Sequence, residues 1–557
     1  MTGLKLLMNF LNIPGVKSKL SLAALLAAVL LAFTMGRTPL LNAAEVEGEG
    51  PAEQAPEEAQ PEPEAFSFED VVQNARRLAQ EPFVKPNGGK SDFLKKVSRE
   101  QWNGISFQEN RRLWREIDSD FQAGFFHPGF IFDQPPAISV IDSGVERPLK
   151  FSTDFFTYSD TELQEKAGQM ELDFAGFRLL YPLHDAERMD EVVSFLGATH
   201  FRGLARHSRY GLEARGLILN PAHPAGEEFP YFRHFWLVRP GPEEAATTVY
   251  ALLDSPSLTG AYKFVVTPGP STVMKVTVRI FKRSGREFPE TVGLAPLGSM
   301  YLFSEKEGPN GDWRPEVHNS DILLYSTADK RWFRRPLSNP KRLEINSYAL
   351  NSPSGFGLMQ QDNNFDHYQD LNARYDLRPS LWIEPVGDWG PGRLELIEIP
   401  ADQDIHSNII AFWRPYLIDG DSLNYEYKMY WMPSGVIPHQ LGRAVDTRRA
   451  GWNGGGSHFI IDFEGGQLTD IPAESGLASL VDVSSAGVQV REKKLVKNSV
   501  TGGWRLEFKI KPPESGVVDN LMSARGERRS LHIEAVLKKG ENFPDALTET
   551  WVYDLPY

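Results

Sequence analysis

Polar and apolar residues alternate along many short stretches of this chain. The sequence VMKVTVRIF, residues 273–281, places valine and isoleucine on one side of an extended backbone and lysine, threonine and arginine on the other. WRLEFKI, residues 504–510, repeats this alternation. Successive side chains of a strand point to opposite faces, so a period of two predicts strands with one buried face. Further strands are predicted at residues 173–183, 458–466, 531–537 and 548–555.

Two stretches near the start of the folded chain have a helical pattern instead. In residues 66–80, Ser67 can cap a helix whose third position is Asp70, and Phe66 can pack on Val71 as a hydrophobic staple. Residues 106–121 form a second short helical pattern. The chain is therefore predicted to be all-β, with a little helix at the N-terminal end of its folded part.

A change in the sequence pattern near residue 434 predicts a domain boundary. Pro433, Gly435, Pro438 and Gly442 interrupt any periodic pattern between the flanking strands. We expect a large β-sandwich domain at residues 66–434. The regularly spaced short strands of residues 443–557 favour a smaller, immunoglobulin-like β-sandwich.

The first residues have the pattern of an export signal. Lysines precede an apolar run at residues 20–35, and small residues follow at Ala43 and Ala44. Residues 1–44 are therefore predicted to be a signal peptide, and an uncleaved membrane anchor is the alternative. Residues 45–65 are rich in Glu and Pro and contain no basic residue, which predicts a disordered acidic spacer.

Composition and charge exclude several classes of function. The formal net charge of -15 argues against a nucleic-acid partner, because a phosphate surface requires a basic patch. The chain has no Cys, so it has no disulfides, thiolate zinc sites or Cys nucleophiles. A phosphate loop, a Ser-hydrolase elbow and paired-His metal spacing are also missing from the sequence. We therefore expect no metal and no cofactor.

The candidate chemistry gathers in one stretch, from Asp312 to Trp413. It mixes carboxylates, aromatic residues, Arg and Gly more densely than any other part of the chain. Pyranose C–H faces lie on aromatic rings while sugar hydroxyls bond to carboxylates, so this mixture is typical of a groove for a sugar chain. The alternative interpretation is that the rings belong to the core and the acids to turns. Glycoside cleavage needs two carboxylates, and this stretch contains too many to select the pair.

Several segments together resemble one family, the periplasmic glucans biosynthesis proteins G and D. They include YGLEARGL, WRPEVHNSD, NSPSGFGLMQQDNNFDHYQDLNARYDLRPSLWIEP, GDWGPGRLELIEIP and TETWVYDLP. The likeness covers about residues 66–557 and is greater to the G members. It implies a galactose-mutarotase-like N-terminal sandwich, a periplasmic location and a role in making glucans with a β-1,2-linked glucose backbone.

The resemblance also implies site residues. Relatives that cleave β-1,2-glucan with inversion use two Asp, and those positions are Asn319 and Ser407 in this chain. Neither side chain can replace a carboxylic acid near neutral pH. Asp321 and Asp404 stand nearby and are the candidate catalytic residues. The candidate substrate-binding residues are Trp313, Arg314, Glu316, Tyr368, Asp370, Tyr375, Arg378, Trp382 and Trp389.

Three functions remain open at this point, and the remotest is a general mutarotase-like sugar enzyme, which would need a His general acid or base in the cleft. In the first, the protein holds a β-glucan chain in a cleft of the N-terminal domain and trims or transfers it. In the second, it is a non-catalytic carbohydrate-binding protein that escorts nascent glucan from a membrane glucan synthase. The expected partners are thus a β-glucan chain and that synthase, and contact with the membrane itself would occur only through an uncleaved signal.

Overall fold

The computed structural model describes residues 65–85, 92–304, 308, 311–418, 420–453, 455–484, 488–511, 530–539 and 546–556. The predicted signal peptide, residues 1–44, and nearly all of the predicted spacer, residues 45–65, lie outside these ranges. In the described part of the chain, no helix has the length and apolar character needed to cross a membrane.

The helix expected at residues 66–80 is confirmed as α1 (Phe68–Ala79). Ser67 is its N-cap, and the Ser67 backbone N–H donates to the Asp70 carboxylate at 2.7 Å. Phe66 packs with Val71 in one apolar cluster, as a hydrophobic staple should. Two shorter helices follow, α3 (Arg99–Asn103) and α4 (Thr161–Gly168).

The prediction of a helix at residues 106–121 is wrong. This stretch contains strand β1 (Ile105–Phe107), the 3-10 turn η1 (Glu109–Arg111) and irregular chain. Trp114 has a φ of 66°, in the left-handed region that ends a helix. The backbone N–H of Leu113 donates to the Ala123 carbonyl at 2.8 Å. Pairing with other strands therefore overrides the local helical pattern.

Two large sheets form most of the molecule. The first sheet has 10 strands, namely β2 (Gln122–Phe126), β6 (Gly176–Asp185), β7 (Arg188–Leu196), β8 (His200–Gly203), β9 (Glu213–Arg215), β10 (Leu217–Leu219), β15 (Val292–Ser299), β24 (Ile409–Pro415), β23 (Gly392–Glu398) and β20 (Glu344–Leu350). The second has 14 strands, namely β28 (Ala478–Val483), β31 (Ser530–Lys538), β32 (Thr550–Pro556), β19 (Trp332–Pro336), β18 (Ile322–Thr327), β21 (Pro353–Met359), β22 (Ser380–Val386), β25 (Ser422–Met432), β14 (Thr272–Lys282), β13 (Leu258–Thr267), β12 (Thr247–Asp254), β11 (Tyr231–Val238), β3 (Ala137–Asp142) and β4 (Val145–Pro148). Two small sheets pair β1 with β5 (Phe156–Tyr158) and β16 (Tyr301–Phe303) with β17 (Val317–His318).

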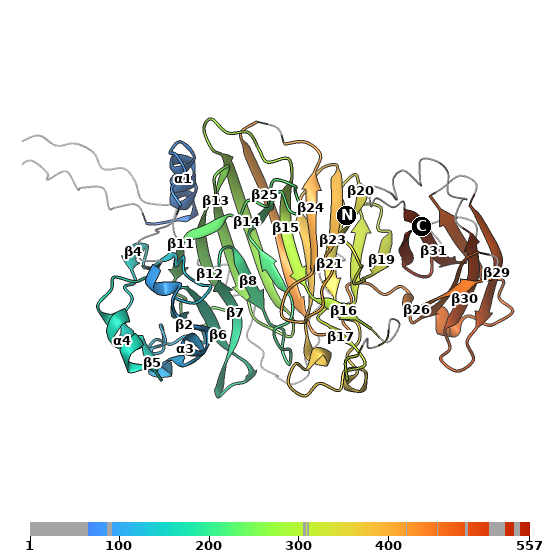
Figure 1. The fold of residues 1–557 in the computed structure, drawn as a ribbon, viewed down its shortest axis with the longest axis horizontal. Coiled ribbons are helices and arrows are strands. Elements are labelled where there is room, and N and C mark those ends of the chain that lie inside the picture. Colours follow the sequence, from blue (N-terminus) through green and yellow to red (C-terminus); the bar gives the residue numbers. More distant parts are fainter. Residues whose placement is uncertain are drawn as a thin grey trace, which may run out of the picture. The chain divides into compact units, whose positions relative to one another are not determined.

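The main core lies between these two sheets, which appear as two layers in Figure 1. Phe195 of β7 meets Phe264 of β13 across the layers, with ring centroids 5.1 Å apart. Buried and less buried residues alternate along β14 from Thr272 to Ile280, as the sequence pattern predicts. The all-β sandwich architecture is thereby confirmed.

The C-terminal strands have a core of their own. A 4-stranded sheet of β26 (Arg443–Trp452), β27 (Gly456–Glu464), β30 (Trp504–Lys511) and β29 (Gln489–Lys497) shares one apolar cluster with β31 and β32. Strand β32 also pairs in parallel with β19, so the larger sheet continues into this region. The boundary near residue 434 falls between β25 and β26, and the division into domains at residues 66–434 and 443–557 stays a prediction.

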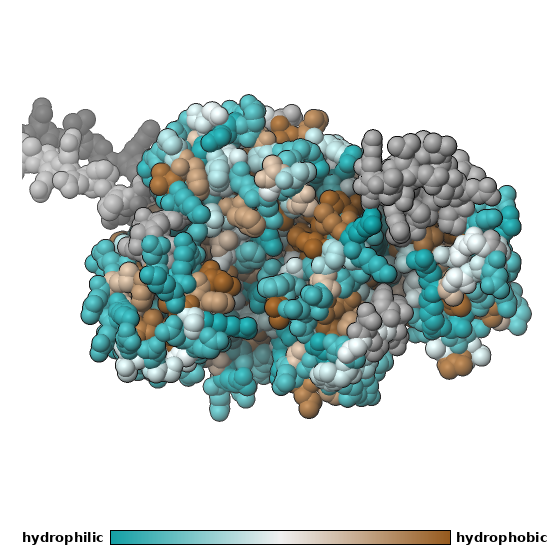
Figure 2. All heavy atoms as spheres, in the orientation of Figure 1, coloured by the Kyte–Doolittle hydropathy of each residue, from teal (hydrophilic) through white to brown (hydrophobic). Residues whose placement is uncertain are grey.

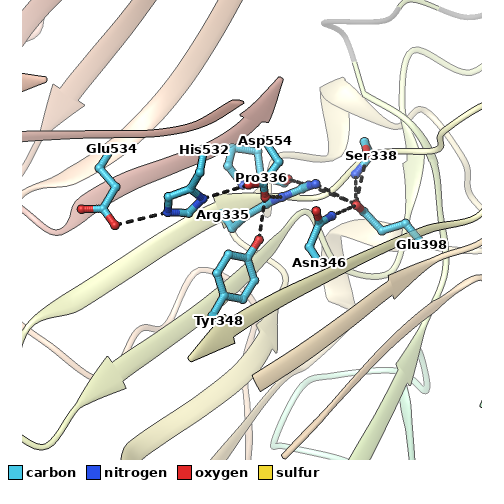
Figure 3. Close-up of polar contacts among 9 residues, drawn as sticks. All are labelled: Arg335, Pro336, Ser338, Asn346, Tyr348, Glu398, His532, Glu534 and Asp554. Carbon is cyan, nitrogen blue, oxygen red and sulfur yellow. Dashed lines mark hydrogen bonds and ion pairs between the residues drawn. The ribbon is translucent and has the colours of Figure 1, made fainter. Parts of the chain in front are cut away.

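A buried polar network joins the two regions (Figure 3). Arg335 of β19 forms an ion pair of 2.7 Å with Glu398 of β23 and one of 3.5 Å with Asp554 of β32. Asp554 also accepts a hydrogen bond from Tyr348 and contacts His532 at 2.9 Å. On the face drawn in Figure 2 the described surface is mainly hydrophilic, and apolar residues show in separate patches.

Candidate functional site

Three loops supply most of the polar residues that the sequence analysis selects. The first leads from β16 into β17 and carries residues 312–316. The second joins β21 to β22 and contains the 3-10 turns η3 (Phe365–His367) and η4 (Tyr375–Leu377). The third joins β23 to β24 and carries Asp404. Direct hydrogen bonds connect these three loops.

Arg314 is the residue on which the loops converge. Its Nη1 lies 2.6 Å from Asp404 Oδ2 and 3.4 Å from Asp370 Oδ2, and its Nη2 lies 2.7 Å from Asp312 Oδ2. The Tyr375 hydroxyl donates to the same oxygen of Asp404 at 2.9 Å. Partial burial opposes the charge of Asp404, but Arg314 and Tyr375 hold the pKa of this carboxyl below its usual value. Asp404 is therefore ionised at neutral pH and unsuited to act as a general acid.

Local turns set the position of Tyr375. Asp370 Oδ1 accepts the backbone N–H groups of Asn372 and Ala373, both at 2.9 Å. Arg374 adopts a left-handed conformation, with φ at 47°, and pairs with Asp376 at 2.7 Å. Such carboxylate-capped turns explain why acids cluster in this loop. Some of the acids are therefore turn residues, as the alternative interpretation expected.

Trp313 presents an open ring beside this cluster. The residue is 71% exposed, and the Arg314 guanidinium carbon lies 5.9 Å from its ring centroid. An exposed indole face next to charged hydrogen-bonding groups is the combination that a sugar ring requires.

Arg378 and Asn319 continue the polar surface. The Arg378 guanidinium carbon lies 5.5 Å from the Tyr375 ring centroid, and the Asn319 amide donates to the Gly211 carbonyl at 3.1 Å. Arg378 Nε and Asn319 Oδ1 are buried and find no hydrogen-bond partner among the described residues. Burial lowers the pKa of Arg378, and the neighbouring charges of Arg209 and Arg202 lower it further. Both atoms are covered in this structure, so a ligand could reach them only if side chains moved.

Glu316 lies in a different environment, at a cavity of about 510 Å³. Its Oε2 is 2.8 Å from His318 Nε2, and His318 Nδ1 is 3.0 Å from Gln360 Oε1. The Gln360 amide nitrogen faces the Tyr368 hydroxyl at 2.9 Å, which fixes its orientation. Burial opposes the charge of His318, but these acceptors raise the pKa of the imidazole above its ordinary value.

Asp321 lines the same cavity, at the start of β18. Its Oδ1 accepts the backbone N–H of Gln361 at 3.0 Å. Tyr368 is fully buried, and its hydroxyl donates to the Asp362 carbonyl at 3.0 Å. The two candidate catalytic carboxylates therefore belong to different environments, since Asp404 lies in the Arg314 cluster and Asp321 at the cavity.

Comparison with known proteins assigns the family. The family model described as "Periplasmic glucan biosynthesis protein, MdoG" matches residues 66–555. The chain belongs to the MdoG family. A protein named glucans biosynthesis protein G from Pseudomonas paraeruginosa is 37% identical over 507 residues, which cover 88% of this chain and 93% of the relative. A protein of the same name from Pseudomonas aeruginosa is 36% identical over the same length.

Ser407, one of the two positions that the sequence analysis compared with the catalytic Asp of glucan-cleaving relatives, contacts a carboxylate. Its hydroxyl donates to Glu213 Oε1 at 3.3 Å. Glu213 is 8% exposed, and its Oε2 lies 3.2 Å from Arg202. Burial opposes the charge, but His200, Arg202 and Arg215 hold the pKa of Glu213 below its usual value. The sequence analysis missed Glu213. The one sequence signal for Glu213 was that it is a charged residue within the otherwise uncharged start of the segment YGLEARGL.

Two of the predicted binding residues of this MdoG-family chain lie away from the Arg314 cluster. Trp382 is 4% exposed and stacks on Trp332, with ring centroids 5.3 Å apart. Trp389 packs its edge on Tyr425 and Tyr427, and its indole N–H donates to the Glu426 carbonyl at 3.1 Å. The buried ring of Trp382 has no face open to a ligand. The structure groups Arg314, Asp370, Tyr375 and Asp404, with Trp313 and Arg378 beside them.

Proposed function

We propose that this protein acts in periplasmic glucan biosynthesis by holding a β-1,2-glucan backbone on the surface formed by Trp313, Arg314, Tyr375, Arg378 and Asp404. Family membership supports the process, since the family and its relatives are named for glucan biosynthesis. The site geometry supports the ligand class. The observation that carries the proposal is an exposed indole beside a hydrogen-bonded cluster that joins three loops.

Each group in this surface has a role suited to a neutral polysaccharide. The Trp313 ring receives the C–H face of a glucose unit, while the ionised Asp404 accepts hydrogen bonds from hydroxyls. The partly exposed Arg378 side chain offers further N–H donors to sugar hydroxyls. None of these contacts requires a bond to be cut.

Binding of linear β-1,2-glucan by calorimetry tests this proposal. Asp404→Asn is expected to weaken binding about 5- to 150-fold, because a charged hydrogen-bond acceptor contributes about 1–3 kcal/mol. Asp402→Asn is the matched control, since Asp402 is an exposed carboxylate of the same loop. The proposal fails if the wild type does not bind the glucan, or if both variants bind it as tightly as the wild type does.

A second candidate function is trimming or transfer of the bound glucan, and the contact between Ser407 and Glu213 favours it. An ionised Glu213 can accept the proton of an attacking hydroxyl, directly or through Ser407. That hydroxyl would come from water for trimming and from another glucan chain for transfer. Its oxygen would bond to the anomeric carbon, the glycosidic C–O bond would break, and the leaving oxygen would take up a proton from the solvent. Mass spectrometry of the glucan after incubation measures both reactions. Activity that is lost in Glu213→Gln but kept in Asp402→Asn would support this function, whereas an unchanged chain length with the wild type would contradict it.

The proposed role also implies where the protein acts and which enzyme supplies the glucan. The protein would act in the periplasm after export by residues 1–44, and a membrane glucan synthase would deliver the nascent glucan. Without catalysis the protein would serve as the escort of that chain. Cell fractionation and co-purification with the synthase are the direct measurements. A cytoplasmic location of the full chain would contradict this part of the proposal.

A further inference from the structure

A second group of side chains has the composition of a metal site. Glu316, Asp362 and His367 each bring one donor atom to a point where all three atoms lie within 4.8 Å of one another. All three residues line the cavity of about 510 Å³. Zinc binds nitrogen and oxygen donors at about 2.0–2.2 Å in a tetrahedral arrangement, so its donor atoms stand about 3.5 Å apart. Only small side-chain movements would therefore bring these atoms into a coordination sphere.

We propose that Glu316, Asp362 and His367 bind a divalent first-row transition metal, with Zn²⁺ as the best match. An imidazole with two carboxylates suits Zn²⁺ better than Ca²⁺ or Mg²⁺, which prefer oxygen donors alone. The sequence had no paired-His spacing to indicate this site. Glu316 comes from the loop before β17, while Asp362 and His367 come from the loop after β21, and folding brings them together.

Neighbouring groups already orient the three ligands. Asp362 Oδ1 accepts the backbone N–H of Asn364 at 2.9 Å, and the Asn364 side-chain amide contacts His367 Nε2 at 3.1 Å. Glu316 Oε2 is held by His318 at 2.8 Å. Outer contacts of this kind fix ring and carboxylate orientation in known metal sites.

The charges around the cavity favour a cation at this position. Arg334 and Arg335 line the cavity, but they form ion pairs with Glu549 and Glu398, which do not line it. The guanidinium of Arg443, also in the lining, contacts Gln361 Oε1 at 3.3 Å. Asp321 adds another carboxylate to the same wall. The whole lining carries six carboxylates and four arginines, a formal excess of two negative charges that a divalent ion would balance.

A metal here would also tie together two of the loops that build the Arg314 cluster. The loop that holds Glu316 presents Arg314 two residues earlier, and the loop that holds His367 continues to Tyr375. The metal is therefore expected to stabilise the fold and to order these loops. The inference stands independently of glucan binding, because its test uses the metal alone.

Titration of the tag-free protein with Zn²⁺, followed by calorimetry and elemental analysis, tests the proposal. We expect one equivalent of Zn²⁺ on the wild type and a higher melting temperature in its presence. His367→Ala and Asp362→Asn should each weaken binding at least about tenfold. His367→Ala is the safer variant for folding, because its side chain is 43% exposed.

His184→Ala is the matched control. His184 also faces a carboxylate, with Nδ1 2.7 Å from Asp190, but within the described residues it belongs to no group of three such donors. Its Zn²⁺ binding should equal that of the wild type. The proposal is overturned if the wild type takes up no stoichiometric Zn²⁺, or if His367→Ala and His184→Ala bind it equally.

Discussion

Tryptophan residues in the 312–413 stretch occupy opposite environments. Trp313 is 71% exposed beside Arg314, while Trp382 is 4% exposed in a cluster with Ile322, Leu324 and Met359. Both residues were expected to contact glucan, since an aromatic ring beside an acid has the same sequence signature in a core and in a groove. Burial distinguishes them, and it depends on the strand that lies opposite each ring.

Alanine substitutions should separate these two roles. Trp382→Ala is expected to lower the free energy of unfolding by about 3–5 kcal/mol, because it leaves a large cavity. Trp313→Ala should change that free energy by less than about 0.5 kcal/mol, yet weaken glucan binding. Urea unfolding and calorimetry measure the two effects. A large loss of stability in Trp313→Ala would show that its ring is structural.

At the scale of elements, close approach of strands decides which residues β21 can carry. A Cβ atom added to Gly355 would stand 2.2 Å from Trp382 Cζ2 and 2.9 Å from the Ile383 carbonyl oxygen of β22. Gly357 has a similar restriction, at 2.3 Å from the Leu381 carbonyl oxygen. The PSGFG sequence at residues 353–357 therefore serves packing between strands, although glycines in such a segment also resemble loop residues.

Gly355→Ala is expected to destabilise the protein by about 1–3 kcal/mol, because either the buried Trp382 ring or the β22 backbone must move. Gly451→Ala in β26 is the control, since a Cβ atom there meets nothing within 4 Å. Thermal unfolding of both variants measures the difference. Equal melting temperatures would mean that β21 and β22 can move apart without a loss of stability.

For the whole molecule, the polar network of Figure 3 connects the C-terminal strands to both large sheets. His532 of β31 contacts Asp554 at 2.9 Å and Glu534 at 3.3 Å. Burial opposes its charge, but these two carboxylates raise the pKa of His532 to about 9. Arg335 and Tyr348 share Asp554 with it, so one charged histidine supports contacts of β19, β20 and β32.

This network predicts a pH dependence of stability. The pKa of His532 is higher in the folded state than the ordinary value of about 6.5, so its contribution is fully present below that pH and is lost as pH rises to about 9. We expect the wild type to lose about 1–3 kcal/mol of unfolding free energy over this range by this route. In His532→Gln, the unfolding free energy should not show this part of the decrease. Urea denaturation at several pH values measures the unfolding free energy of both proteins. The assignment would be contradicted if this free energy changed with pH in the same way in the two proteins.

Several parts of this protein could be predicted from its sequence because their causes are local. The period of two in β14 and β30, the Ser67 cap of α1 and the all-β class all follow from neighbouring residues. The family segments could also be found by reading along the chain. Local pattern failed at residues 106–121, where pairing with distant strands determines the backbone.

Within the candidate site, the sequence by itself determined that acids, arginines and rings are concentrated between residues 312 and 413. Only the tertiary structure decided that Arg314, Tyr375 and Asp404 meet, that Trp382 is buried, and that Glu213 lies beside Ser407. The physical reason is that a hydrogen bond or a buried contact depends on distances of a few ångströms between separate loops. Those distances are set by the packing of the two sheets, and no local sequence pattern encodes them.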